Sequence, residues 1–168
     1  MRRTVHALAT ACGWLAAGFL AAIAVATLVQ IGARQFGHPI EMTELSGFFL
    51  AASTFLGLAY TLIAGGHVRV SLVSQFVPDG VRRIVELWCC AIGLAITGFM
   101  TWQVGFFALE TWRFNELSPG LLAIPMWIPQ SAVAFGLAVL VLALLEQAVV
   151  VLRGQEPDYA TNDDGVAE

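Results

Sequence analysis

Four long stretches of this sequence contain no Asp, Glu, Lys, Arg or His, and they constrain the fold more than any other feature. They cover residues 7–33, 45–66, 87–109 and 117–145. An apolar helix of about 20 residues crosses the hydrocarbon core of a bilayer, at about 1.5 Å per residue. One such stretch also suits a buried helix of a soluble protein, but four in 168 residues do not fit a water-soluble core. The sequence therefore predicts an all-α integral membrane protein with four transmembrane helices.

The composition agrees with a chain that has little contact with water. Hydrophobic residues make up 58% of the chain and charged residues 12%, whereas soluble domains carry roughly 25% charged residues. Most of the exterior must therefore face lipid or other protein. The three cysteines, Cys12, Cys89 and Cys90, lie in apolar runs without CxxC spacing. They indicate neither a disulfide framework nor a metal site, and no cofactor is expected.

We expect a single four-helix domain over residues 1–153, followed by a disordered acidic tail at 154–168. The expected helices are 7–33, 45–66, 87–109 and 126–150, the last one beginning after the prolines of the fourth apolar run. Between the second and third helices, residues 67–76 mix apolar and polar side chains. Both a strand-like and a helical pattern fit there, and an interfacial amphipathic helix is favoured because a strand edge at the membrane leaves backbone groups unpaired. Pro78-Asp79-Gly80 predicts a turn.

The arginine distribution predicts the orientation. With the N-terminus inside, the cytoplasmic segments hold six arginines and the outer loops hold only Arg34 and Arg113, so the positive-inside rule favours both termini in the cytoplasm. Arg2, Arg3 and the Ala24-Val25-Ala26 triplet also resemble a cleavable secretory signal. The apolar run is longer than the 7–15 residues of a usual signal core, which favours an uncleaved anchor.

Small residues and tryptophans indicate how the helices pack and where they end. Small residues at helix-packing spacing are typical of close helix contacts, within this chain or with another membrane subunit. They are Gly18, Ala22 and Ala26 in the first run, Ser53, Gly57 and Thr61 in the second, and Ala91 and Ala95 in the third. Trp88, Trp112 and Trp127 fall at the expected membrane boundaries, as interfacial anchors do, whereas Trp14 and Trp102 lie deeper and fit contacts in the bundle or with a partner.

No ionisable residue lies near the centre of any expected span. Glu44, Glu110, Glu116 and Glu146 mark the ends of the runs. Intramembrane charges usually mark ion or substrate pathways, so the pattern argues against a self-sufficient proton-coupled transporter. No hydrolase, kinase or zinc motif is present, and an enzyme is not expected. His6 and His67 leave one alternative, a haem-binding membrane anchor of a quinone-linked oxidoreductase.

The ordered motifs resemble the small membrane subunit, or DctQ-like component, of tripartite ATP-independent periplasmic (TRAP) transporters. The resembling residues are Arg34 with Phe36-Gly37-His38-Pro39, Glu44-Leu45-Ser46, Phe55-Leu56-Gly57, Gly66-His67-Val68-Arg69-Val70, Pro78, Arg82, Ser118-Pro119, Ile124-Pro125 and Trp127. Two departures stand out: Ser71 lies where the family often has an acidic residue, and Met42-Thr43 lies where an aromatic often precedes the glutamate.

This resemblance implies a non-catalytic small permease subunit in the bacterial inner membrane. Its implied partners are a large multi-spanning subunit that carries the transport sites, and a periplasmic substrate-binding protein that delivers organic acid anions for symport. The candidate interaction residues on the periplasmic face are Arg34, Glu44, Glu110, Arg113, Glu116 and Trp127. Those at the cytoplasmic interface are His67, Arg69, Arg82 and Arg83.

Overall fold

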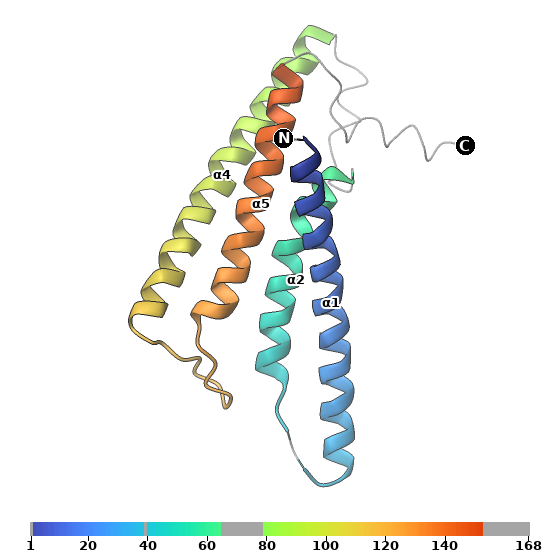
Figure 1. Ribbon diagram of the computed structural model, residues 1–168, viewed down its shortest axis with the longest axis vertical. Helices are drawn as coiled ribbons and strands as arrows, with labels where there is room; N and C mark the ends of the chain where they lie inside the picture. The colour runs from blue at the N-terminus through green and yellow to red at the C-terminus, as the bar shows by residue number, and fades with distance from the viewer. Residues whose placement is uncertain (1, 39, 65–78, 153–168) are drawn as a thin grey trace, which may run out of the picture.

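The computed structural model describes residues 2–38, 40–64 and 79–152, and these residues form four long helices (Figure 1). The helices are α1 (Arg2–Gln35), α2 (Thr43–Ile63), α4 (Asp79–Arg113) and α5 (Trp127–Leu152). Each is long and apolar enough to cross a membrane. No β-strand occurs in the described part of the chain. The prediction of an all-α protein with four helices of membrane-spanning length is confirmed.

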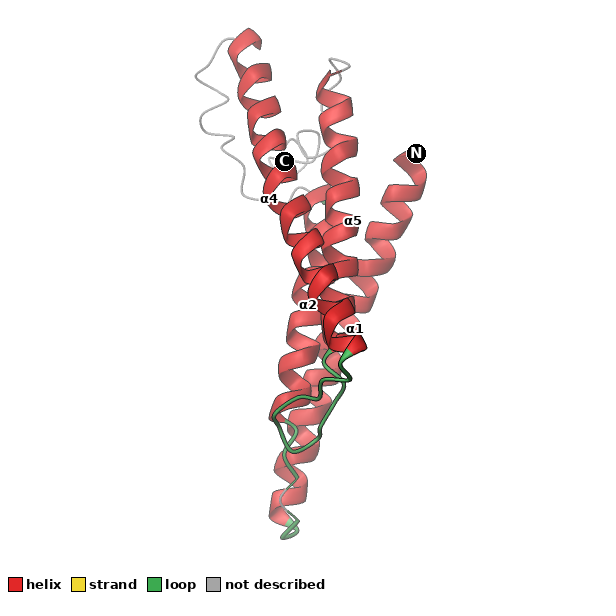
Figure 2. Cartoon of the chain, turned by 90° about the vertical axis from the view of Figure 1, so that its left-hand side faces the viewer, coloured by secondary structure: helices red, strands yellow, loops and turns green. Residues whose placement is uncertain are grey.

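The four helices run antiparallel, so the two described loops lie at one end of the molecule. Figure 1 shows α1 and α4 running in one direction and α2 and α5 in the other. The α1–α2 connection and the α4–α5 connection therefore lie toward the same end, which Figure 2 shows from the side. We call this the loop end, and we call the opposite end, with the start of α1 and the finish of α5, the terminal end.

The helix bounds differ most from the prediction at the start of α4. This helix begins at Asp79 rather than at residue 87, so the predicted turn at Pro78-Asp79-Gly80 is wrong for Asp79 and Gly80. A carboxylate near the free N–H groups of a first helical turn is favourable, which suits Asp79 to a helix start. The predicted interfacial helix at 67–76 and the acidic tail at 154–168 lie outside the described residues.

The core consists of α1, α2 and α5, with small residues where the three helices meet. The buried cluster contains Val5, Ala9, Cys12 and Ala16 of α1, Ala52, Leu56, Ala59 and Leu62 of α2, and Val139, Leu140 and Ala143 of α5. Helix α4 adds nothing to this cluster and packs chiefly against α5. Small side chains allow helix backbones to approach closely, which is how membrane helices gain van der Waals contact without a hydrophobic driving force.

The closest approach between helices occurs at Gly136 of α5. A Cβ atom there would lie 2.6 Å from the carbonyl carbon and oxygen of Phe55 in α2. Only a residue without a side chain fits against backbone atoms at this distance, since the backbone of a packed helix cannot move aside. Gly13 of α1 is similarly close to a neighbour, because a Cβ there would lie 2.8 Å from the ring of Tyr60.

The predicted small-residue ridges are only partly those that pack. Ser53 is buried and donates a hydrogen bond of 3.0 Å to the carbonyl oxygen of Ala16. A Cβ atom added to Gly57 would lie 3.7 Å from the Cβ atom of Ala16, so Gly57 faces that methyl group. Gly18, however, faces open space, and Ala91 and Ala95 are exposed. Ala26 of the predicted α1 ridge is buried, and the rest of the α1 packing face is the earlier Ala9–Cys12–Ala16 set, because α5 contacts α1 as well as α2.

Most mid-span hydroxyl groups are satisfied within their own helix. Each donates to a carbonyl oxygen one turn earlier: Thr54 to Leu50 at 2.8 Å, Thr97 to Gly93 at 2.7 Å and Thr101 to Thr97 at 2.7 Å. Such bonds remove the cost of an unpaired hydroxyl group in lipid. These residues therefore need no polar pathway to explain their presence.

Replacing Gly136 by alanine should destabilise the bundle, because the added methyl group collides with the Phe55 backbone. Overpacking of this kind costs about 1–3 kcal/mol. We expect a lower thermal unfolding temperature for Gly136→Ala in detergent solution.

The matched control is Gly98→Ala in α4, where a Cβ would meet nothing within 4 Å. Alanine is a better helix former than glycine by up to about 1 kcal/mol, so this variant should unfold at the same temperature or higher. Equal destabilisation by both variants would contradict the close contact of α5 and α2.

Candidate interaction surface at the loop end

The α4–α5 connection folds back on itself through its own backbone hydrogen bonds. The amide of Ser118 donates to the carbonyl oxygen of Ile124 at 2.9 Å, and the amide of Met126 donates to that of Glu116 at 3.1 Å. Two residues of the connection have positive φ, Asn115 at 49° and Ala123 at 45°, and the chain changes direction at both. Asparagine adopts this conformation readily, whereas alanine does so at a cost. The connection is therefore a defined structural element.

Glu44 joins this element to the other half of the molecule. Its side chain extends from the first turn of α2, and Oε2 accepts a hydrogen bond of 3.4 Å from the amide of Leu122. A Cβ atom on Gly120 would overlap the Glu44 carboxylate, so a larger residue there would displace the end of the Glu44 side chain. The other carboxylate oxygen, Oε1, is buried and has no hydrogen-bond partner among the described residues. The Glu44 contact ties the α1–α2 hairpin to the α4–α5 hairpin.

A second polar contact joins the ends of α4 and α5. The hydroxyl group of Thr111, which is buried, donates to Oε1 of Gln130 at 2.6 Å. Thr111 lies in the last turn of α4 and Gln130 in the first turn of α5. Sequence analysis did not identify this pair, because nothing in the spacing of 19 residues indicates which polar residues meet across a loop.

The six residues predicted for this surface all lie at the loop end, but they do not form one cluster. Among contacts between described residues, only the Glu44 side chain of this set makes a hydrogen bond, and none of the six makes an ion pair. Glu110 and Glu44 are half-buried, whereas Arg34, Arg113 and Glu116 are exposed. Trp127 begins α5 and remains partly exposed. The structure thus brings Glu44 to the α4–α5 connection and leaves Arg34 near the end of α1.

Only two of the four residues predicted for the cytoplasmic interface lie in the described part of the chain. His67 and Arg69 lie outside the described residues. Arg82 and Arg83 belong to the first turns of α4, at the terminal end of the molecule (Figure 1). Helix α4 therefore begins before its uncharged segment, and the two arginines lie in the part of the helix that precedes this segment.

Two polar residues near the terminal end of α5 are more buried than the sequence indicates. Gln147 is 1% exposed, and neither polar atom of its side chain has a hydrogen-bond partner among the described residues. Both carboxylate oxygens of Glu146 are also shielded from solvent without a partner in that part of the chain. The sequence predicts that Glu146 lies at the end of a span. Its burial depends on how α5 packs against other helices, and the spacing of residues along one helix does not reveal this packing.

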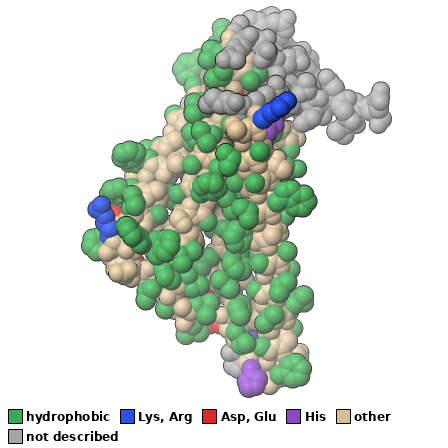
Figure 3. Space-filling view, viewed as in Figure 1, with side chains coloured by type: hydrophobic (Ala, Val, Ile, Leu, Met, Phe, Trp, Pro, Cys, Tyr) green, Lys and Arg blue, Asp and Glu red, His purple; other side chains and the backbone are tan. Residues whose placement is uncertain are grey.

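The most exposed apolar surface belongs to α4. Of the α4 side chains that the structure describes, only Cys90 and Thr111 are buried. Large exposed side chains follow one another at helical spacing, and we call them the α4 stripe: Trp88, Ile92, Phe99, Trp102, Phe106 and Leu109. Figure 3 shows hydrophobic side chains over the visible face, with charged ones near its ends. Packing of Trp102 or Trp14 inside the bundle is excluded, since they are 73% and 76% exposed.

The described residues include no metal-binding cluster. No group of three or more His, Cys, Asp or Glu side chains lies close enough to hold a metal ion within the described ranges. The polar contacts at the loop end are structural, because they join helix ends and loops. The arrangement is suited to contacts with another protein and with lipid.

Comparison with known proteins identifies one protein family. The family model for the DctQ component of tripartite ATP-independent periplasmic transporters matches residues 23–154, which is most of the chain. No curated protein and no solved structure matched the sequence. The match agrees with the resemblance of the sequence motifs, and it gives no support to the alternative of an oxidoreductase anchor.

Replacing Glu44 by alanine should loosen the α4–α5 connection, because Leu122 loses the acceptor for its amide. A hydrogen bond to a charged group contributes up to about 1.5–3 kcal/mol, and this one is long and exposed, so we expect a gain of a few-fold in amide exchange. Hydrogen–deuterium exchange of the peptide that contains residues 117–125 measures the change.

Glu41→Ala is the control, since Glu41 is an exposed carboxylate that precedes α2 without a side-chain hydrogen bond. Its exchange pattern should match that of the unmodified protein. Unchanged exchange in Glu44→Ala, or the same gain in Glu41→Ala, would refute a joining role for Glu44.

Proposed function

This chain belongs to the DctQ component family of tripartite ATP-independent periplasmic transporters, and we propose that it braces the large transport subunit instead of moving solute itself. In this role it is a non-catalytic small permease subunit of the bacterial inner membrane. The observation that carries the proposal is the α4 stripe, a row of large apolar side chains that no described residue of this chain covers.

The α4 stripe suits contact with another membrane protein. Its members include two tryptophans and two phenylalanines, Trp88, Trp102, Phe99 and Phe106, each more than half exposed. Lipid tails contact such side chains without fixed geometry, whereas the ridges and grooves of a neighbouring helix fill the spaces between the rings. Aromatic side chains also contribute much of the binding energy in protein interfaces. We therefore assign the large subunit to this side of the molecule.

The loop end is the proposed docking surface for a periplasmic substrate-binding protein. With both termini in the cytoplasm, as the arginine distribution favours, the loop end faces the periplasm. There Arg34, Glu110, Arg113 and Glu116 offer charges of both signs, and Glu44 holds the α4–α5 connection in position. Exposed ion pairs contribute about 0–1 kcal/mol each, so this surface suits a partner that binds and releases.

The proposed cytoplasmic contacts are His67, Arg69, Arg82 and Arg83. Arginines near the start of α4 are suited to anionic headgroups and to bracing the partner. The proposed cargo of the assembled transporter is an organic acid anion taken up by symport, and this part of the proposal rests on the family resemblance alone.

The bracing role predicts that the α4 stripe is needed for assembly. We expect the triple variant Phe99→Ala, Trp102→Ala, Phe106→Ala to reduce co-purification with the tagged large subunit about tenfold or more, because interface aromatics often contribute about 2 kcal/mol or more each. The measurement is pull-down from detergent-solubilised membranes.

The control triple is Leu20→Ala, Val25→Ala, Leu28→Ala, which removes exposed apolar side chains of α1. It should assemble normally. If the α4 variant assembled as well as the control, the large subunit would have to bind elsewhere.

The proposed orientation predicts which loop is reached from outside the cell. Leu121 is highly exposed at the loop end. In a chain whose three cysteines are replaced by alanine, Leu121→Cys should react with a membrane-impermeant maleimide in spheroplasts. Thr4→Cys, at the terminal end, should react only after lysis. The reverse labelling pattern would invert the orientation.

A further inference from the structure

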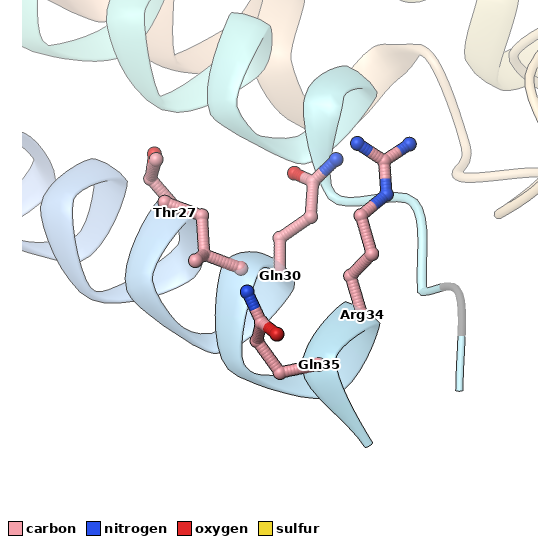
Figure 4. Close-up of a pocket in the computed structure, with 5 residues that line it drawn as sticks. Thr27, Gln30, Arg34 and Gln35 are labelled. Carbon is pink, nitrogen blue, oxygen red and sulfur yellow. The ribbon is translucent and has the colours of Figure 1, made fainter. Parts of the chain in front are cut away.

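An open hollow, mostly apolar in its lining but with several polar side chains, lies on α1 near the loop end (Figure 4). It has a volume of about 330 Å³ and is lined by Thr27, Gln30, Ile31, Arg34 and Gln35, all from this helix. Positions 27, 30, 31 and 34 share one helix face, since residues three, four and seven apart point the same way. Figure 4 shows the side chains of Gln30 and Arg34 extending from α1 on the same side.

The polar groups of this hollow are unused within the described part of the chain. Thr27 donates to the carbonyl oxygen of Ile23 at 2.9 Å, within its own helix. The side chains of Gln30, Arg34 and Gln35 make no hydrogen bond or ion pair with any described residue. A guanidinium group and two amides are therefore free to bind a ligand on this face.

The hollow lies at the depth of lipid headgroups. Helix α1 has 34 residues, a length of about 51 Å at about 1.5 Å per residue, whereas the hydrocarbon core is about 30 Å thick. Arg34 is the first charged residue after the uncharged run at 7–33. The seven helical steps from Thr27 to Arg34 rise about 10 Å, so the hollow extends from the headgroup region to the edge of the hydrocarbon core.

We propose that this hollow binds the phosphodiester group of a membrane phospholipid. The planar guanidinium group of Arg34 matches two phosphate oxygens, and the amide groups of Gln30 and Gln35 can donate to the phosphate or to headgroup hydroxyls. One cation facing one phosphodiester is balanced in charge. Ile31 and Leu28, which lies three residues earlier on α1, are both exposed and offer an apolar surface to the acyl chain.

A lipid fits the hollow better than a soluble protein partner does. The lining of the hollow continues along α1 from Arg34 toward the centre of the membrane, as far as Thr27. A binding protein that docks at the loop end can reach Arg34, but it cannot follow the helix into the bilayer. A phospholipid covers this whole length with its headgroup and the first part of its acyl chain.

Native mass spectrometry of the full-length chain in detergent, titrated with dioleoylphosphatidylglycerol, tests the proposal. We expect Arg34→Ala to weaken binding of the tightest lipid roughly tenfold, as loss of a charge-assisted hydrogen bond does. Gln30→Leu should weaken it less, and dioleoylglycerol, which lacks the phosphate, should not bind in this site. Arg34 is exposed, and matched thermal unfolding curves confirm that the variant is folded.

Arg113→Ala is the matched control, because Arg113 is an exposed arginine at the same end of the molecule and outside the hollow. It should bind the lipid as the unmodified chain does. The proposal is overturned if both arginine variants lose lipid equally, if neither does, or if excess inorganic phosphate displaces the lipid. It is also overturned if Arg34→Ala leaves lipid binding intact and instead releases a protein partner from the assembled complex.

Discussion

The contact of α5 with α2 at Gly136 holds the two helix hairpins together. The Gly136 backbone lies against the Phe55 carbonyl group, with no room for a side chain. Apolar helices gain no hydrophobic free energy by leaving lipid for each other, so close van der Waals contact of this kind is a main contribution to the association of the two hairpins. This contact brings the first turn of α2 near the α4–α5 connection, where Glu44 reaches Leu122 and Gly120. It also directs α5 inward, and so leaves α4 on the outside with its aromatic stripe uncovered.

The fold class could be predicted from the sequence because it depends on the length and polarity of each apolar segment. Uncharged runs of membrane-spanning length show both properties directly. The start of α4 was missed, since charged residues at 79–83 end an apolar run without ending a helix, which continues past the membrane surface. The packing face of α1 was predicted only in part, since Ala26 is buried but Gly18 is not. Gly18 and Ala9 both belong to small-residue rows of α1, and only the position of α5 decides that Ala9 is buried while Gly18 faces open space.

The sequence predicts which charged residues lie at the loop end, but it does not predict the contacts that their side chains make. Arg34, Glu44, Glu110, Arg113 and Glu116 lie there because charged residues mark the ends of apolar spans. That Glu44 alone among the six candidates makes a side-chain hydrogen bond depends on the fold of the α4–α5 connection, which positive φ angles at Asn115 and Ala123 shape. Gln147 was missed for the same reason, since its burial results from tertiary packing.

The proposed accessory role agrees with the positions of the polar groups among the described residues. Mid-span hydroxyls donate within or between helices, and the charged candidates lie at the helix ends, so no ionisable row leads across the bundle. The most direct test is uptake of labelled organic acid anions into proteoliposomes, supplied with binding protein and a sodium gradient. Vesicles with this chain alone should accumulate nothing above protein-free vesicles, whereas vesicles with both membrane subunits should accumulate solute. Accumulation by this chain alone would contradict the bracing role.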